Sequence, residues 1–258
     1  MPTFASRGVA IHYGEYGDPA GAPVLLLHGF ASNARVNWVS TSWTETLSNA
    51  GFRVIAPDFP GHGESGKPHD PAHYPAPEMA RDMLNLLDHL GLRKAHVMGY
   101  SMGARVAAFM AIAAPERICA LVLSGMAGNL IAGVGGAEEI ARALLAQDAA
   151  DPSLPAWARG FRQFAERVGN DLRALAACIT ASRTPIEPQE LERLEIPVLV
   201  AVGGEDTIAG DPRALMPYLK QGELIVLDGR DHMNAVGDLS HKRAVTGFLR
   251  RHARLCAQ

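Results

Sequence analysis

The sequence has few of the features that mark several large classes of protein. It contains three cysteines among 258 residues, 6% aromatic residues, and no apolar run longer than the nine residues from Val106 to Ala114. A membrane-spanning helix needs about 18 apolar residues, so we expect no membrane span. Three cysteines without CxxC spacing fit neither a disulfide framework nor a zinc site, so we expect Cys119, Cys178 and Cys256 to be buried, reduced thiols.

The sequence also lacks a strong excess of charge of either sign. Its 24 Lys and Arg residues against 27 Asp and Glu residues give a net charge of −3, which argues against a nucleic-acid-binding protein. Because 48% of the residues are hydrophobic and 20% are charged, we expect a folded globular chain rather than a disordered one. The first seven residues lack a basic start followed by an apolar core, so we predict no secretory signal and a cytoplasmic location. We expect a monomer or a homodimer.

Short apolar runs bounded by Gly or Pro recur along the chain, as is typical of strands buried on both faces. They lie at 24–27, 54–56, 95–98, 118–123, 197–202 and 224–227, and an alternating run from Val9 to Tyr16 indicates an edge or hairpin strand. Helical patterns lie between or after them, at 43–50, 77–91, 102–114, 212–220 and 239–252. This alternation predicts an α/β fold with a mostly parallel sheet, in one domain that carries an insertion.

The insertion is the segment from Met126 to Ile196, which interrupts the alternation of strands and helices. It is rich in Ala, Arg and Leu and has no convincing strand. We expect it to be helical and to cover the carboxyl edge of the sheet. Its apolar side chains are candidate walls of a pocket: Met126, Leu130, Ile131, Trp157, Phe161 and Phe164.

A Gly-x-Ser-x-Gly motif is the strongest functional signal in the sequence. Gly99-Tyr100-Ser101-Met102-Gly103 follows the predicted strand 95–98 and opens the predicted helix 102–114. This context favours a tight turn from strand to helix that projects the serine hydroxyl above the sheet. Ser101 is therefore the candidate nucleophile. Arg105 lies one helical turn further on, where we expect it to be buried in an ion pair with a carboxylate.

A serine hydroxyl needs a base, and a histidine base needs a carboxylate to orient it. His232 lies in the polar loop after the last predicted strand, and Asp206 lies in the loop after the preceding strand. Both loops are expected at the same edge of the sheet as Ser101. Glu205 is the second choice for the carboxylate, and we assign Asp231 to bracing of its own loop.

The order Ser101, Asp206, His232 resembles that of the α/β-hydrolase family. His28-Gly29-Phe30 and the segment from Asp58 to Ser65 are similar to two further signatures of that family. The resemblance implies a sheet of about eight strands, with a helical cap at 126–196 inserted after the sixth strand of a core formed by 1–125 and 197–258. It also implies an oxyanion hole formed by the backbone amides of Phe30 and Met102. We expect His28 and His62 to brace loops rather than to bind metal.

The resemblance predicts a serine hydrolase of the carboxylesterase type, acting on a small to medium ester without cofactor or metal. Lactonase, thioesterase, carbon–carbon bond hydrolase and perhydrolase activities share this triad, so they stay open. A ligand sensor that keeps the triad is a further alternative. Haloalkane dehalogenases and epoxide hydrolases resemble the fold but use aspartate where this chain has Ser101, which argues against both activities.

Overall fold

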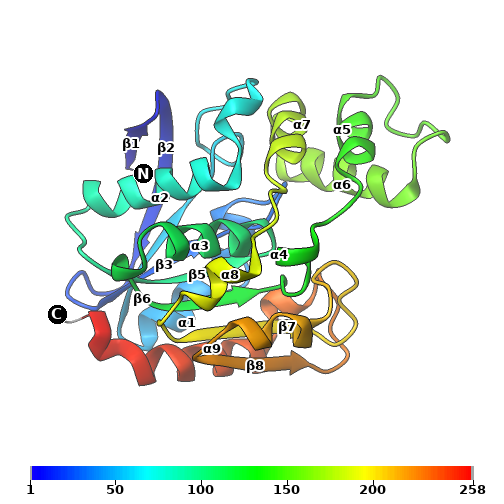
Figure 1. Ribbon diagram of the computed structural model, residues 1–258. Coiled ribbons are helices and arrows are strands. Elements are labelled where there is room, and N and C mark those ends of the chain that lie inside the picture. Colours follow the sequence, from blue (N-terminus) through cyan, green and yellow to red (C-terminus); the bar gives the residue numbers. More distant parts are fainter. Residues whose placement is uncertain (1, 257–258) are drawn as a thin grey trace.

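An eight-stranded sheet forms the centre of the computed structural model, which describes residues 2–256 (Figure 1). The strand order is β1-β2-β4-β3-β5-β6-β7-β8. β2 pairs antiparallel with both β1 and β4, and the strands from β3 to β8 run parallel to one another. The strands are β1 (Thr3–Ser6), β2 (Val9–Tyr16), β3 (Ala22–Leu27), β4 (Phe52–Pro57), β5 (Ala95–Tyr100), β6 (Ile118–Ser124), β7 (Val198–Gly203) and β8 (Gly222–Leu227). The expected α/β fold with a mostly parallel sheet is confirmed.

Helices flank the sheet, and several more lie between β6 and β7. The α-helices are α1 (Trp43–Asn49), α2 (Ala76–His89), α3 (Met102–Ala113), α4 (Asn129–Ala132), α5 (Ala137–Leu145), α6 (Ala156–Val168), α7 (Leu172–Ala181), α8 (Pro188–Glu192) and α9 (Leu239–His252). Short helical turns complete the chain: η1 (Arg35–Val39), η2 (Pro71–His73), η3 (Pro115–Arg117), η4 (Pro212–Ala214), η5 (Met216–Tyr218), η6 (Ala235–Gly237) and η7 (Ala253–Cys256). No helix within residues 2–256 is long and apolar enough to cross a membrane.

The alternation of side chains along the strands builds two cores, one on each face of the sheet. In β3, Leu25 and Leu27 pack into the core that contains α2 and α3, whereas Val24 and Leu26 pack into the core that contains α1 and α9. All four side chains are fully buried. Because helices cover both faces of the sheet, its inner strands are continuous apolar runs in the sequence and do not alternate between apolar and polar residues.

The segment between β6 and β7 is helical and contains its own small apolar core. Ile140 and Leu144 of α5, Ala158 of α6 and Leu175 of α7 are buried together there. Figure 1 shows α5, α6 and α7 standing beyond the carboxyl end of the sheet. This arrangement agrees with the helical insertion that the sequence predicts.

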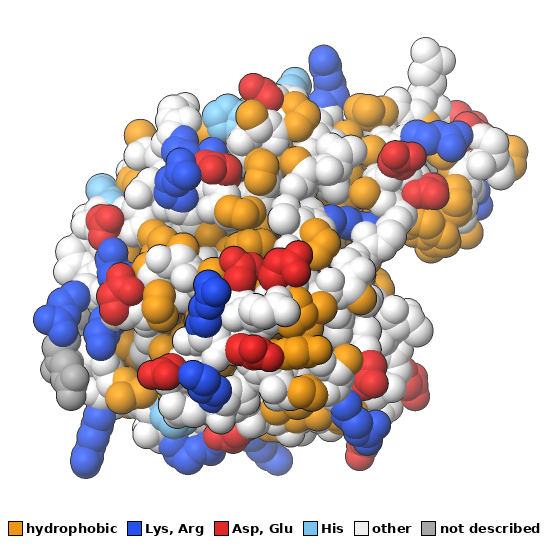
Figure 2. Space-filling view, viewed as in Figure 1, with side chains coloured by type: hydrophobic (Ala, Val, Ile, Leu, Met, Phe, Trp, Pro, Cys, Tyr) orange, Lys and Arg blue, Asp and Glu red, His pale blue; other side chains and the backbone are white. Residues whose placement is uncertain are grey.

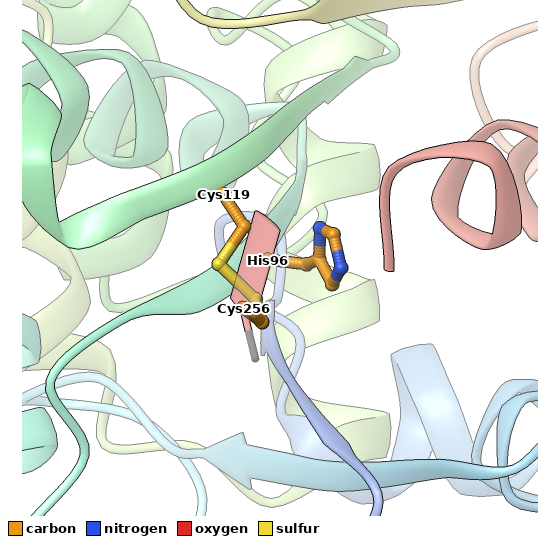
Figure 3. A group of neighbouring side chains, drawn as sticks. All are labelled: His96, Cys119 and Cys256. Carbon is orange, nitrogen blue, oxygen red and sulfur yellow. A yellow bond between two sulfur atoms is a disulfide. The ribbon is translucent and has the colours of Figure 1, made fainter. Parts of the chain in front are cut away.

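The prediction of three reduced thiols is wrong for two of the cysteines. Cys119 in β6 and Cys256 in η7 form a disulfide that closes a loop of 137 residues, and it lies beside His96 of β5 (Figure 3). Cys178 is buried and free as expected. The two bonded cysteines are 137 positions apart in the sequence, and this spacing does not indicate that η7 packs beside the start of β6.

Two local predictions also differ from the structure. Residues 212–220 form the turns η4 and η5 instead of one helix, because Pro217 lacks the amide that an α-helix interior requires. The hairpin strand β1 was not expected. Arg7 and Gly8 connect it to β2, with φ values of 46° and 78° that suit a two-residue hairpin turn.

Candidate active site

The turn from β5 to α3 places Ser101 above the carboxyl edge of the sheet. Ser101 has a φ of 55° and a ψ of −114°, and its amide donates a hydrogen bond of 2.8 Å to the carbonyl of Ser124. The flanking glycines are required by close packing. A Cβ atom on Gly103 would lie 2.0 Å from the carbonyl oxygen of Leu27, and one on Gly99 would lie 2.2 Å from that of Gly103. The sharp turn thus depends on these two glycines.

Three predicted site residues form one hydrogen-bonded chain. His232 Nε2 lies 3.0 Å from Ser101 Oγ, and His232 Nδ1 lies 2.8 Å from Asp206 Oδ2. Because the carboxylate accepts the proton on Nδ1, Nε2 is left to accept a proton from the serine hydroxyl. Asp206 and His232 follow β7 and β8, so the sheet topology brings them to the same edge as Ser101.

The carboxylate of Asp206 is held by its own loop. Its Oδ1 accepts hydrogen bonds of 2.8 and 2.9 Å from the amides of Ile208 and Ala209, and its side chain is 0% exposed. Glu205, the second choice from the sequence, is exposed and lies outside this network. Asp231 accepts hydrogen bonds from the amides of Met233 and Asn234, which agrees with a role in bracing its loop.

The loop that follows β3 is fixed by several buried polar side chains. Asn37 Oδ1 accepts the Gly29 amide at 2.9 Å, and His28 donates from Nδ1 to the Gly29 carbonyl at 2.8 Å while its Nε2 accepts the Phe59 amide. Burial lowers the pKa of His28, so its imidazole is neutral in this role. Within residues 2–256, the amide of Phe30 donates no hydrogen bond, and neither does that of Met102. Both amides are therefore available to a ligand.

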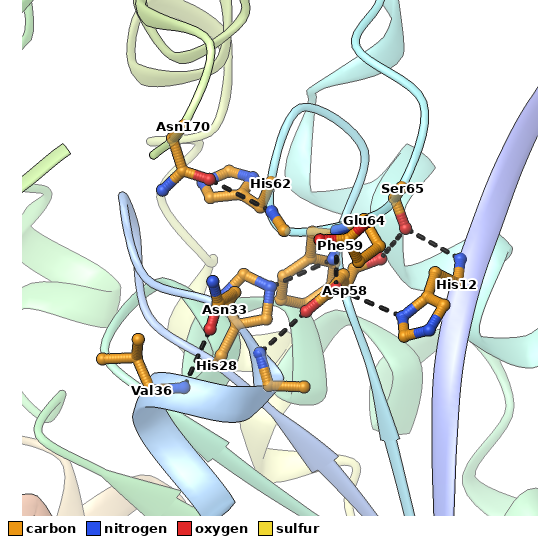
Figure 4. Close-up of polar contacts among 12 residues, drawn as sticks. His12, His28, Asn33, Val36, Asp58, Phe59, His62, Glu64, Ser65 and Asn170 are labelled. Atoms are coloured by element: carbon orange, nitrogen blue, oxygen red, sulfur yellow. Dashed lines mark hydrogen bonds and ion pairs between the residues drawn. The ribbon is translucent and has the colours of Figure 1, made fainter. Parts of the chain in front are cut away.

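Asp58 joins this loop to the segment that follows β4, as Figure 4 shows. Its two carboxylate oxygens accept the amides of Ala34 and Glu64 at 2.8 and 2.9 Å, and His12 Nδ1 lies 3.3 Å from Oδ2. His62 Nδ1 donates to the carbonyl of Pro60, and burial holds the pKa of His62 well below its usual value. The expectation that His28 and His62 brace loops agrees with these contacts.

Asn170, between α6 and α7, connects the helical insertion to the same loops. Its Nδ2 donates to the Ala31 carbonyl at 2.8 Å, and its Oδ1 accepts the Gly63 amide at 3.1 Å. Ala31 has a φ of 57°, an unfavourable value for a residue with a Cβ atom, so this contact holds a strained position next to Phe30. No motif in the sequence pointed to Asn170.

A pocket of about 550 Å³ opens beside Ser101 and is lined mainly by apolar side chains. Four of the six wall residues expected from the sequence line it: Met126, Trp157, Phe161 and Phe164. Leu130 and Ile131 instead pack in or against the core of the sheet. Figure 2 shows the surface hollowed where α5 and α6 overhang the body of the molecule.

Arg105 is buried beside this pocket without the carboxylate that we expected. Its guanidinium donates to the backbone carbonyls of Asn129 and Thr184 at 2.8 and 2.6 Å. The expectation of an ion pair is therefore wrong, because carbonyl oxygens at the base of the insertion take the place of the acid. This arginine connects α3 to the start of α4 and to the segment that follows α7.

One cluster within residues 2–256 has side chains close enough to share a metal ion: His96, Cys119 and Cys256. Two of its three ligand atoms are the sulfurs of the disulfide, which lies at the start of β6, whereas Ser101 follows the end of the parallel strand β5.

A model of the alpha/beta hydrolase fold matches residues 22–185. The chain is 32% identical over 259 residues to the dihydrolipoyllysine-residue acetyltransferase component of the acetoin cleaving system of Pseudomonas putida, covering 95% of this chain and 68% of that protein. It is 28% identical to 3-oxoadipate enol-lactonase 2 of Acinetobacter baylyi, covering 96% of each.

Two further similarities differ in extent. Epoxide hydrolase 3 of Siraitia grosvenorii is 37% identical over 123 residues, which are 46% of this chain and 36% of that protein. A solved hydrolase structure from Pseudomonas aeruginosa superimposes with a TM-score of 0.78 at 26% identity, over 96% of this chain and 97% of that one.

Proposed function

The chain belongs to the alpha/beta hydrolase fold family, and we propose that it is a serine hydrolase that cleaves a small to medium carboxylic ester. The observation that carries this proposal is the chain of hydrogen bonds from Asp206 through His232 to Ser101. In the proposed reaction, His232 Nε2 takes the hydroxyl proton as Ser101 Oγ attacks the ester carbonyl. Asp206 stabilises the imidazolium that forms.

The rest of the cycle follows from the same groups. His232 gives its proton to the departing alcohol, which leaves the acyl group on Ser101. A water molecule then attacks this acyl-enzyme, with His232 again as the base, and the acid is released.

The free amides of Phe30 and Met102 support a role as the oxyanion hole. Such donors stabilise the negative oxygen of the tetrahedral intermediate, and one of them contributes typically about 10²- to 10³-fold in rate. Met102 begins α3, so the positive end of that helix adds to the field at the same place. The polar contacts of Gly29 and Ala31 on either side of Phe30 would hold this amide in position.

We propose that residues 126–196 act as a cap over a core formed by 1–125 and 197–258. Trp157 and Phe161 of α6 and Met126 line the pocket together with Ser101, so the insertion would supply the apolar wall against which the substrate packs. The pocket volume suits a substrate of small to medium size.

A lactonase is the second candidate, and the full-length similarity to 3-oxoadipate enol-lactonase 2 favours it. A lactone is a cyclic ester, so the same three residues would open it by the same steps. Thioesterase, carbon–carbon bond hydrolase and perhydrolase activities, and a triad-retaining ligand sensor, remain alternatives. An epoxide hydrolase would need aspartate at the elbow, where this chain has Ser101.

The test is a series of p-nitrophenyl esters from acetate to laurate, measured beside a panel of aliphatic lactones. We expect turnover that peaks at one chain length and a fluorophosphonate label on Ser101. Ser101→Ala should abolish both, and Asp206→Asn should lower kcat by about 10⁴-fold. Glu205→Gln is the matched control and should stay active. Labelling without turnover of any ester or lactone would favour the sensor.

The predicted location in the cytoplasm stays part of this proposal. The Cys119–Cys256 pair tests it: disulfides persist mainly in oxidising compartments, so a cytoplasmic protein is expected to carry these two cysteines as thiols in the cell. Alkylation of thiols in freshly lysed source cells, followed by mass measurement, would show the redox state of this pair in place.

A further inference from the structure

The pocket beside Ser101 is lined by three arginines and, within residues 2–256, by no aspartate or glutamate. The three are Arg105, Arg167 and Arg183, and none of them belongs to a salt bridge with a described carboxylate. A cation beside an apolar cavity is costly unless an anion or dense hydrogen bonding compensates for the lost water. The charge of Glu139 offsets part of the lowering of the Arg183 pKa by burial, but no described carboxylate lies within 4 Å of these three guanidinium groups. The lining of the pocket thus keeps an excess of positive charge.

Arg105 is the most buried of the three, at 2% exposed. Both of its terminal nitrogens already donate to backbone carbonyls, Nη1 to Thr184 and Nη2 to Asn129. Burial, together with the neighbouring charge of Arg183, lowers the pKa of Arg105 to about 10, so it is still a cation at neutral pH. Arg105 therefore adds positive charge to the pocket, but its terminal nitrogens are already engaged by backbone carbonyls.

Arg183, just after α7, has free donors. Its Nη1 donates to the carbonyls of Val134 and Gly135, and within the described chain its Nε and Nη2 donate to no residue. Arg183 is half-buried at the pocket wall, next to the Thr184 carbonyl that Arg105 binds. The charge of Arg183 acts on Arg105, so the two guanidinium groups lie near one another in the lining of the pocket, and the Nε and Nη2 donors of Arg183 bind no described residue.

Arg167 differs from this pair because an aromatic ring faces its charge. Its guanidinium carbon lies 5.7 Å from the centre of the Phe164 ring. A cation over the face of an aromatic ring is stabilised there without an anion. The charge of Arg167 is therefore stabilised by an aromatic ring, which distinguishes it from the charges of Arg105 and Arg183.

We propose that Arg183, with the charge of Arg105 behind it, forms a subsite for a carboxylate group, and that the substrate is an ester or lactone carrying such a group on its acyl part. The open Nε–Nη2 edge of a guanidinium matches the two oxygens of one carboxylate in a bidentate pair. The apolar side chains of Phe161 and Met126 suit the methylene chain between the two ends.

The assignment of the anion to a substrate depends on the proposed function, but the subsite can be measured without turnover. Ser101→Ala protein is titrated calorimetrically with monomethyl esters of dicarboxylic acids from succinate to suberate, and with the matching dimethyl esters. We expect the monoanion to bind at least about tenfold more tightly at the best length, because a charged hydrogen bond contributes about 1.5–3 kcal/mol. Equal binding of monoanion and diester would overturn the subsite.

Turnover gives the second readout, using mono-p-nitrophenyl esters of the same diacids and their neutral methyl counterparts. We expect kcat/KM to favour the anionic ester, and Arg183→Gln to reduce this preference by about 10- to 100-fold. Arg183→Lys, which keeps the charge, should restore part of it. Arg173→Gln removes an exposed arginine of α7 as a matched control and should leave the preference unchanged.

The outcomes separate the two proposals. If neutral esters turn over and Arg183→Gln leaves the preference unaltered, the subsite is wrong and the serine hydrolase stands. If neither ester series turns over but Ser101→Ala protein binds the monoanion through Arg183, the subsite stands and the hydrolase proposal fails. If Arg167→Gln, rather than Arg183→Gln, removes the preference, the assignment to Arg183 is wrong.

Discussion

The hydroxyl of Tyr100 donates a hydrogen bond of 2.6 Å to the backbone carbonyl of His232. Tyr100 precedes Ser101 in the elbow, so this contact connects the turn that holds the proposed nucleophile to the loop that holds the proposed base. Burial, reinforced by the charge of Asp206, raises the pKa of Tyr100, and the hydroxyl is a donor throughout the neutral range.

We expect Tyr100→Phe to lower kcat by about 2- to 10-fold, which corresponds to one hydrogen bond. The reason is that the His232 loop loses its anchor to the elbow while the triad itself remains. Steady-state kinetics with the best ester checks this. An unchanged kcat would show that the loop keeps His232 in place without Tyr100.

Asn170→Ala should lower kcat about tenfold with a smaller effect on KM, because Asn170 holds the carbonyl of Ala31 next to the Phe30 amide. The split between kcat and KM distinguishes positioning of the oxyanion from binding of substrate. The thermal midpoint is measured in parallel. A lower midpoint with unaltered kcat would make Asn170 merely structural.

The disulfide should stabilise the fold, because it closes a loop of 137 residues. We expect Cys119→Ser with Cys256→Ser to lower the free energy of unfolding by about 2–4 kcal/mol in urea titrations. Dithiothreitol should destabilise the wild type and leave the double variant unaffected. Cys178→Ala is the control: its stability should respond to dithiothreitol as the wild type does, and loss of that response would contradict the pairing.

Acid should destabilise the protein through His96, whose two ring nitrogens are buried without a hydrogen-bond partner. Burial lowers the pKa of His96 from 6.5 to about 4. Between these pH values the unfolded chain binds the proton and the folded chain does not, so stability falls as the pH drops from 6.5 to 4.

His96→Phe removes this titrating group, so the free energy of unfolding of the variant should fall less steeply between pH 6.5 and 4. Urea midpoints at a series of pH values measure the slope, and at pH 8 His96 is neutral in both states, which gives the reference. Equal slopes in the wild type and the variant would show that His96 is not buried as a neutral imidazole.

Most of the fold could be predicted from the sequence, because apolar runs mark the buried strands and glycines mark the ends of strands and helices. The strand from Val9 to Tyr16 and the helix from Leu239 to His252 have the predicted bounds. The short hairpin strand β1 and the turns at 212–218 were not predicted, since four residues carry too little periodicity and Pro217 acts against the pattern around it.

The proposed triad could be predicted because each member follows a recognisable strand. Asn170 and Arg183 could not, since both lie in the insertion, where no strand fixes the direction of a side chain. Their contacts with Ala31 and Val134 depend on how the helices of the insertion pack against the core. The disulfide of Cys256 could not be predicted either, because the pairing depends on where η7 packs against the start of β6.

The most direct test of the proposed reaction is rapid acid quenching of the protein with its best p-nitrophenyl ester, followed by mass measurement of the intact chain and its peptides. We predict an acyl adduct on Ser101 that forms in the first turnover and decays at the rate of the steady state. Turnover without an adduct on Ser101, or with an adduct on another residue, would contradict the account.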